Sequence, residues 1–433
     1  MPRSAPIPAL PPDMNNTLDR RSYSVVLRLP GVARLVLSTM LGRSANQMSS
    51  LVLILFALRT YHSPALAGAV VLVQLAAVPV GPLAGALVDR LGSSIMIALD
   101  FAAAAAITAV IAILAFAHML PAALFVLLVL LGTVTWPFSG AGVKALLPQI
   151  VPAPLWDRAN ALDSVTSIVA SIAGPVAAGT MFGLVGPEPA LATVAALYIL
   201  AAFFILGLRG TAQHRQHGSI FGQALSGLGY FYRNRQLRGL ALAIVPGNIS
   251  VGILVVAMPV LLLRTLHQPA ETVGWIWAVV GAFSLVGALV VGRMGTRGRE
   301  RSILAVAMLV PAPGLAVAAF APGVAVSFMV AALVGIGLGP LDVALFSLRQ
   351  RAVDPAWYGR AIAVSMTLNA SGGAIGGGLG GVVSQASPKA ALLISGLFTV
   401  LAAAAAMTIP KAGRLTTPSA SLPAASATSQ VGP

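Results

Sequence analysis

Cysteine is absent from this chain of 433 residues, and charged residues make up only 9% of it. The lack of cysteine excludes disulfides, thiolate metal sites and thiol catalysis, and it leaves the redox compartment undefined. The five histidines have no ligand spacing, so we expect no metal site. Soluble domains contain roughly a quarter charged residues, whereas 58% of this chain is hydrophobic and its mean hydropathy is +0.92. These values predict an integral membrane protein.

Twelve apolar stretches recur along the chain, each about the twenty residues needed to cross a ~30 Å hydrocarbon core. We place them at residues 33–58, 66–88, 93–117, 122–143, 161–184, 189–208, 239–263, 272–292, 302–320, 323–347, 361–385 and 388–409. The first begins after thirty polar and proline-rich residues, unlike a cleavable signal peptide, so we expect the first helix to be retained. The sequence therefore predicts an all-α membrane protein with twelve transmembrane helices.

The net charge of +15 comes from basic residues that are unevenly distributed between the loops. Of the 26 lysines and arginines, only Arg59, Arg264 and Lys389 follow odd-numbered spans, and only Arg43 lies within a span. The other basic residues lie in the tails and near the loops that follow even-numbered spans. By the positive-inside rule both termini are cytoplasmic. The abundance of alanine, and of arginine over lysine, is compatible with a GC-rich bacterium, so we expect a multi-pass protein of the bacterial inner (plasma) membrane. The basic charge thus indicates topology, and we expect no nucleic-acid partner.

The polar segments divide the chain. Residues 1–30 and 411–433 bury too little apolar area to offset their ordering entropy, so we expect both cytoplasmic tails to be disordered. The central loop, residues 209–238, places aromatic residues beside arginines. This pattern favours either an amphipathic helix on the cytoplasmic face, with its aromatic side chains toward lipid, or a partly ordered linker.

An internal repeat relates the first six spans to the last six. Matching residues recur at a nearly constant offset: Gly85-Ala86-Leu87-Val88 with Gly287-Ala288-Leu289-Val290, Gly132 and Pro137 with Gly335 and Pro340, and Gly174 and Gly179 with Gly376 and Gly381. We therefore predict two pseudosymmetric six-helix bundles, residues 31–208 and 239–410.

This organisation resembles the major facilitator superfamily. The family signature between helices 2 and 3 is matched by Gly85, Asp89, Arg90 and Gly92. The stretch from residue 145 to residue 161, which contains Arg158, is similar to the loop between helices 4 and 5 of bacterial drug, macrolide and siderophore exporters. Helix 5 carries Gly174, Pro175 and Gly179, similar to the antiporter signature of proton-coupled exporters. The resemblance implies a secondary transporter with this fold.

The gate residues expected from this resemblance are Gly85, Asp89, Arg90, Gly92, Arg158 and Arg360. Asp89 would face the positive end of helix 11 and form a salt bridge with Arg360. Such contacts would latch the outward-facing state and break when the halves rock apart. The alternative is a solvated turn pair.

Acidic residues are so few that each can be assigned a role. Those in tails and loops, including Glu271 and Glu300, should be solvated. An ionisable group at membrane depth is a functional candidate by default, and the candidates for proton coupling are Asp342, Asp100 and Asp163. A structural partnership of Asp342 with Arg349 is the alternative. For Asp100 and Asp163 we favour gate salt bridges with Arg158, Lys144 or Arg90.

A substrate cavity is expected between the halves, lined by Arg43, Asn46, Gln47, Ser50, Gln74, Trp136, Phe138, Asn248 and Asn369. Arg43 would bind an anionic substrate group, extend to the cytoplasmic surface or pair with an acid. The aromatic residues serve either ligand contact or packing. Pro175 would let helix 5 bend between Gly174 and Gly179. Seven glycines between residues 371 and 381 favour close helix packing over a phosphate-binding loop.

We therefore expect a proton-coupled exporter of amphipathic, drug-like or siderophore-like compounds that works by alternating access as a monomer. Its partners would be a small-molecule substrate, protons and the lipid bilayer, and no cofactor or enzymatic activity is expected. The alternatives are an importer of a small organic solute, a lipid or lysophospholipid translocator, and a membrane receptor that does not transport.

Overall fold

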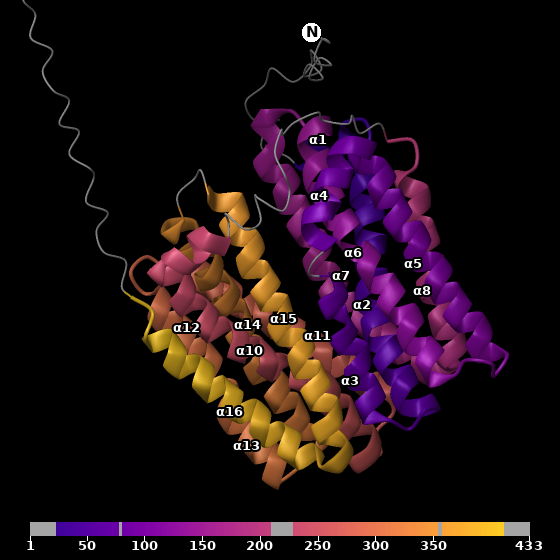
Figure 1. Ribbon diagram of the computed structural model, residues 1–433, viewed down its shortest axis with the longest axis vertical. Coiled ribbons are helices and arrows are strands. Elements are labelled where there is room, and N and C mark those ends of the chain that lie inside the picture. The colour runs from indigo at the N-terminus through magenta and orange to yellow at the C-terminus, as the bar shows by residue number, and fades with distance from the viewer. Residues whose placement is uncertain (1–22, 78–79, 209–227, 354–356, 411–433) are drawn as a thin grey trace, which may run out of the picture.

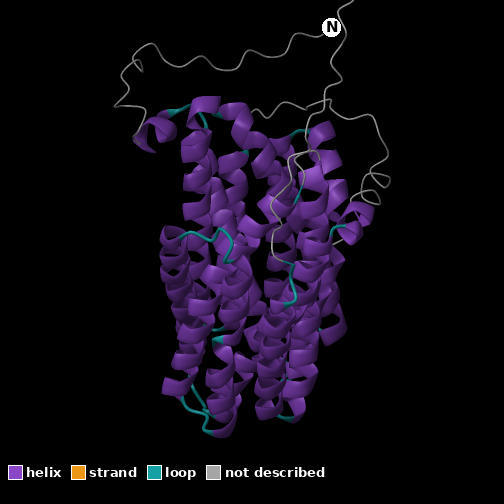
Figure 2. Cartoon of the chain, turned by 90° about the vertical axis from the view of Figure 1, so that its left-hand side faces the viewer, coloured by secondary structure: helices purple, strands orange, loops and turns teal. Residues whose placement is uncertain are grey.

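The computed structural model describes residues 23–77, 80–208, 228–353 and 357–410. Within these ranges the chain is helical and contains no strand (Figure 2). The helices form two bundles that lie side by side, one from each half of the sequence (Figure 1). Most of both tails and residues 209–227 of the central loop lie outside the described residues, so the predictions made for them stay predictions.

The helices follow the predicted spans in order. The first bundle contains α1 (Tyr23–Arg28), α2 (Val32–Thr60), α3 (Pro64–Leu72), η3 (Val73–Ala77), α4 (Val80–Leu91), α5 (Ser93–Phe116), α6 (Ala122–Ile150), η4 (Ala153–Leu155), α7 (Trp156–Val185) and α8 (Pro187–Ile205). The second contains α10 (Arg235–Val260), η5 (Leu261–Thr265), α11 (Ala270–Met294), α12 (Glu300–Leu309), α13 (Pro311–Phe320), α14 (Val324–Ala352), α15 (Tyr358–Ala386) and α16 (Pro388–Met407). Ten of the spans are long and apolar enough to cross a membrane as described.

Two spans that were predicted as continuous helices are interrupted, and proline accounts for the clearer case. The ninth span divides into α12 and α13 because Pro311 has no amide hydrogen to donate back along the helix. The second span changes from α-helix to the tighter 3₁₀ form at Val73 and becomes α-helical again at Val80. The span predicted over residues 66–88 is therefore helical without being α-helical throughout the described residues.

Side-chain caps occur at three of the described helix starts. The Ser63 hydroxyl accepts a hydrogen bond from the Leu66 amide (3.1 Å) at the start of α3, and the Ser387 hydroxyl accepts one from the Ala390 amide (3.2 Å) at the start of α16. A proline follows each serine at the first helical position. Asn234 caps α10 in the same way. Each cap satisfies amides that a helix start leaves unpaired.

The packing within the bundles repeats like the sequence. The contact of α2 with α7 in the first bundle corresponds to that of α10 with α15 in the second, and α2 with α8 corresponds to α10 with α16. Likewise, α5 packs against α8 as α12 and α13 pack against α16. The predicted fold class, two pseudosymmetric bundles of membrane helices, is confirmed.

Large apolar side chains remain on the outer faces of the helices. Phe116 is 78% exposed on α5, Leu242 is 65% exposed on α10 and Val382 is 65% exposed on α15. A water-soluble protein rarely leaves so many such residues uncovered. These faces fit contact with lipid.

Two segments expected to be disordered or bound to lipid pack against the bundles instead. In the N-terminal tail, α1 buries Val25 and Val26 against the segment that joins α6 to α7. In the central loop, Tyr230 stacks on Trp357 with ring centroids 5.2 Å apart, and Phe231 is 2% exposed. The protein itself therefore supplies the apolar surface that these residues cover.

Candidate functional site

The two bundles contact each other through paired glycines at one end, which we name the closed end. There α3 crosses α15 so closely that a methyl group on Gly68 would lie 2.7 Å from the carbonyl oxygen of Gly377 and from Cα of Gly381. On the other side of α15, Gly372 and Gly380 approach α10 in a similar way. The glycine-rich stretch of α15 is thus a two-sided packing surface, as expected.

A second contact at the closed end joins α7 to α11. A methyl group on Gly274 would lie 2.5 Å from the carbonyl oxygen of Pro175, and one on Gly179 would lie 3.0 Å from Cα of Gly274. Gly179 occupies the place in the repeat that Gly381 has in the other half, so the two contacts are pseudosymmetric. Gly174, in contrast, faces α2, where its Cβ would lie 2.5 Å from Cβ of Gln47.

At the opposite end, where α1 and α4 lie, the ribbons of the two bundles diverge (Figure 1). Gly92 forms the turn between α4 and α5 with φ of +96°, a conformation that favours glycine. Arg90 is exposed and Arg158 is half-buried. The structure describes only the backbone of Gly85, Asp89 and Arg360. The latch therefore stays a prediction.

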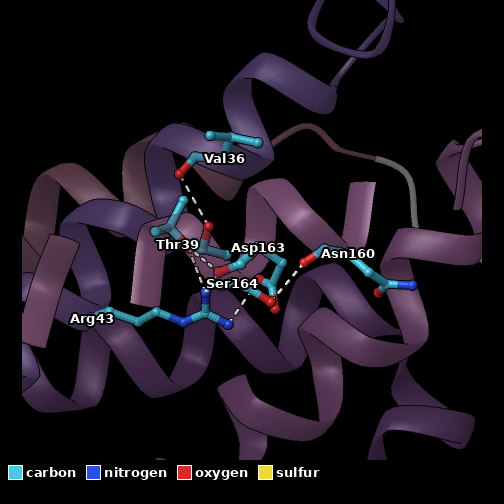
Figure 3. Close-up of polar contacts among 7 residues, drawn as sticks. Val36, Thr39, Arg43, Asn160, Asp163 and Ser164 are labelled. Atoms are coloured by element: carbon cyan, nitrogen blue, oxygen red, sulfur yellow. Dashed lines mark hydrogen bonds and ion pairs between the residues drawn. The ribbon is translucent and has the colours of Figure 1, made fainter. Parts of the chain in front are cut away.

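Arg43 is held by α7, within the first bundle (Figure 3). One guanidinium nitrogen lies 2.8 Å from a carboxylate oxygen of Asp163. Another donates to the backbone carbonyl of Asp163 (2.7 Å) and to the Thr166 hydroxyl (2.5 Å). The side chains of Arg43 and Asp163 keep 29% and 26% of their surface exposed. Of the three roles weighed for Arg43, pairing with an acid is the one observed.

This pairing corrects the partners expected for Asp163. It was expected to pair with Arg158, Lys144 or Arg90, but its ion pair among the described residues is with Arg43. The helical register explains the difference, because Asp163 faces α2, whereas Lys144 and Arg90 are exposed. Thr166 was missed, although its position one turn after Asp163 is the signal that could have identified it.

Asp100 likewise makes no gate salt bridge with any residue that the structure describes. It is 4% exposed and lies inside the first bundle, beside Thr135 and Ser139 of α6, whose hydroxyl groups donate to the carbonyls of Gly132 and Trp136. Tyr198 of α8 lies within electrostatic reach of Asp100, and Asn46 of α2 lies next to Tyr198. The expectation failed because the side chain turns toward α6 and α8 instead of toward the surface.

The second bundle arranges its charges differently. Asp342 lies on an accessible part of α14, within electrostatic reach of Arg349. The Arg349 side chain is fully buried and lies over the ring of Phe346 at 5.6 Å. Glu300 was expected to be solvated, but it is 6% exposed and forms an ion pair with Arg351. The reason is that α12 begins at Glu300 and packs against α14.

The remaining cavity candidates are distributed over both bundles. Asn248 of α10 donates hydrogen bonds to the side chain of Asn369 on α15 and to the carbonyl of Ile244. The bond to Asn369 connects two helices of one bundle, and the bond to Ile244 lies within α10. The other candidates keep partly or largely exposed surfaces: Gln47, Ser50, Gln74, Trp136 and Phe138. Their contact with a substrate stays a prediction.

The family model of the Major Facilitator Superfamily matches residues 35–377 and, in a second match, residues 240–430. The chain belongs to the major facilitator superfamily. It is 35% identical over 407 residues to the uncharacterized MFS-type transporter y4rN of Sinorhizobium fredii, covering 90% of this chain and 97% of the relative. It is also 27% identical over 274 residues to the multidrug efflux pump Tap of Mycobacterium tuberculosis, covering 60% of this chain and 64% of the pump.

Solved structures of superfamily transporters share the fold of this chain at low sequence identity. The nucleoside transporter NupG superposes with a TM-score of 0.70 at 15% identity, over 88% of this chain and 99% of the other. A bacterial homolog of the human lysosomal transporter Spinster, in an inward-facing and occupied conformation, gives a TM-score of 0.70 at 14% identity, over 87% of this chain and 95% of the other.

Proposed function

We propose that this protein is a secondary active transporter that exports amphipathic small organic compounds by alternating access and is driven by proton antiport. The observation that carries the proposal is the pair of pseudosymmetric glycine contacts at the closed end. Helices that touch largely through glycine interlock few side chains, so the two bundles can separate there and close at the other end. A passage that opens at only one end at a time is what a secondary transporter requires.

The positive-inside rule places the diverging end on the cytoplasmic side. The contact of the bundles at the closed end, with their ribbons diverging at the other end (Figure 1), then supports an inward-facing state. Arg43 and Asp163, which remain partly exposed on α2 and α7, are accessible to a compound that enters from this side. Their charges would contact the polar group of an amphipathic substrate.

Export is supported by the relative named a multidrug efflux pump. Proton coupling is supported by Asp100 and Asp342, two carboxyl groups on membrane helices that have no cation within ion-pair distance among the described residues. The cost of a charge at such depth makes each a candidate for reversible protonation.

The test uses everted membrane vesicles that contain the protein, with ethidium as the transported probe. Energised vesicles should accumulate ethidium, and a protonophore should abolish the accumulation. A Gly68→Trp variant should be inactive because an indole cannot fit between α3 and α15. Uptake of ethidium by intact cells instead would indicate an importer, and movement of a fluorescent lysophospholipid between leaflets would indicate a lipid translocator. Either result, or a lack of all transport, would overturn the proposal.

A further inference from the structure

The two bundles place a polar bridge at the same position of their repeat, but the two bridges differ in charge. Residues of α2 recur in α10 at an offset of 205, as from Gly42 to Gly247. At this offset Arg43 corresponds to Asn248. Arg43 joins α2 to α7 through an ion pair, and Asn248 joins α10 to α15 through an amide hydrogen bond. The charged bridge of the first bundle thus has a neutral counterpart in the second.

The neutral bridge consists of Asn248 and Asn369, which we name the amide dyad, and its hydrogen bonds fix the direction of both amides. The Asn248 nitrogen donates to the carbonyl of Ile244 (2.9 Å), one turn earlier in α10, and to the side-chain oxygen of Asn369. Only the nitrogen of an amide can donate to a carbonyl, so the Asn248 oxygen points the other way. Because the Asn369 oxygen already accepts, the nitrogen of Asn369 is the donor that remains.

The amide dyad therefore presents one acceptor, Oδ1 of Asn248, next to one donor, Nδ2 of Asn369. Neither atom has a hydrogen-bond partner among the described residues, and both side chains are half-buried. Both α10 and α15 contact α3 of the first bundle. Asn369 precedes Gly377, which packs against α3, by about two helical turns. The dyad thus lies on the helices that face the first bundle, on the cytoplasmic side of the glycine contact.

Apolar residues surround the dyad on α10. Gly247 directly precedes Asn248, and Val251 follows it by nearly one turn. Together with Leu338 and Leu341 of α14, these two residues line an apolar cavity. A few polar groups set in an apolar surface are typical of sites that bind small organic molecules. The surroundings therefore suit a ligand with one polar group and an apolar body.

The parts of α10 and α15 that carry the dyad have no charged residue. Residues 239–263 and 361–388 contain no Asp, Glu, Lys or Arg. Arg349 of α14 reaches α15 at the sulfur of Met366 (3.8 Å), but its side chain is fully buried. In the first bundle Arg43 and Asp163 compensate each other. A charged ligand group at the dyad would lose its hydration without gaining a counter-ion, whereas a neutral group would not.

From this geometry we infer that the amide dyad binds an uncharged substrate group that carries a hydrogen-bond donor and an acceptor side by side, as a primary carboxamide or a lactam does. The N–H of this group donates to the Asn248 oxygen, and its carbonyl accepts from the Asn369 nitrogen. The inference rests on the proposed export of amphipathic compounds and names a polar group that these compounds carry. It adds a second recognition point to the contact proposed for Arg43 and Asp163.

The first experiment measures binding without transport. Purified protein in lipid vesicles is dialysed to equilibrium against naphthaleneacetamide or against methyl naphthaleneacetate, an ester that keeps the carbonyl but has no N–H. Vesicles without protein correct for partition into lipid. The wild type should bind the amide about 2- to 10-fold more tightly than the ester, because only the amide donates to the Asn248 oxygen.

Substitutions separate the two atoms of the dyad. Asn248→Leu should bring the ratio of the two affinities to about one, because the acceptor that distinguishes the probes is gone. Asn369→Leu should weaken both probes by about 2- to 10-fold and keep their ratio, because both carry the carbonyl that Asn369 contacts. It also tests the site independently if Asn248→Leu does not fold. The matched control Ser371→Ala should change neither affinity, since this hydroxyl donates within α15 to the carbonyl of Thr367 (2.8 Å).

Equal affinity of the wild type for both probes, a ratio that persists in Asn248→Leu, or affinities unchanged in Asn369→Leu would overturn the inference. Accumulation of ethidium in everted vesicles separates this result from the proposed function. If ethidium accumulates but the amide is not preferred, the inference fails and the proposed function stands. If the amide is preferred but no compound is transported, the proposed function fails and the dyad stands as a binding site.

Discussion

Alanine in place of Gly274 should disfavour the conformation in which the two bundles contact each other at the closed end. The added methyl group would lie 2.5 Å from the carbonyl oxygen of Pro175, about 1 Å closer than ordinary contact. Overpacking of this kind costs about 1–3 kcal/mol. The equilibrium constant between the conformation with the closed end in contact and the one with it separated then changes by about 5- to 150-fold, in favour of the separated form. The matched control is Gly292→Ala on the same helix, where a methyl group meets open space.

The natural lack of cysteine makes the assay simple. A single Val71→Cys reporter, 5% exposed and packed at the closed end against Gly377, is labelled from outside the cell with a membrane-impermeant maleimide. Gly274→Ala should raise the labelling rate within the range above, and Gly292→Ala should leave it unchanged. Equal labelling rates in both variants would refute the idea that the glycine contacts set the balance between the contacting and the separated conformation of the closed end.

Three further substitutions test the packing and ion pairs of the bundles by thermal unfolding. Glu300→Gln should lower the free energy of unfolding by about 1.5–3 kcal/mol, because it removes a charged hydrogen bond to Arg351; no change would mean that the pair does not form. Asp163→Asn should cost less than about 1 kcal/mol, since its ion pair is a quarter exposed, and a larger loss would contradict that exposure. Tyr230→Leu should cost about 0.5–1.5 kcal/mol through lost stacking and alter the fluorescence of Trp357; unchanged fluorescence would argue against the stack.

The helical fold and its duplication could be predicted from the chain alone because both depend on patterns along the sequence. Apolar stretches of membrane length specify helices, since every backbone polar group must be satisfied within the bilayer. The match of Gly179 with Gly381 at a constant offset predicts two equivalent halves. The bundle packing then repeats as the sequence does.

The partners of the buried charges could not be predicted in this way. Position along a helix predicted the depth of Asp100 and Asp163 but not the direction of each side chain. That direction depends on which helices pack side by side and on how each is rotated. Asp163 therefore forms an ion pair with Arg43 on α2, while Asp100 lies beside hydroxyl groups on α6.

The sequence by itself determined a membrane protein of twelve spans in two related halves, because hydropathy and repetition are properties of the chain. Only the tertiary structure decided which glycines bring the halves together and which acid has a basic partner. Contacts between helices far apart in sequence depend on the rotation and crossing of each helix. No local pattern specifies these, and they follow from the packing of the whole bundle.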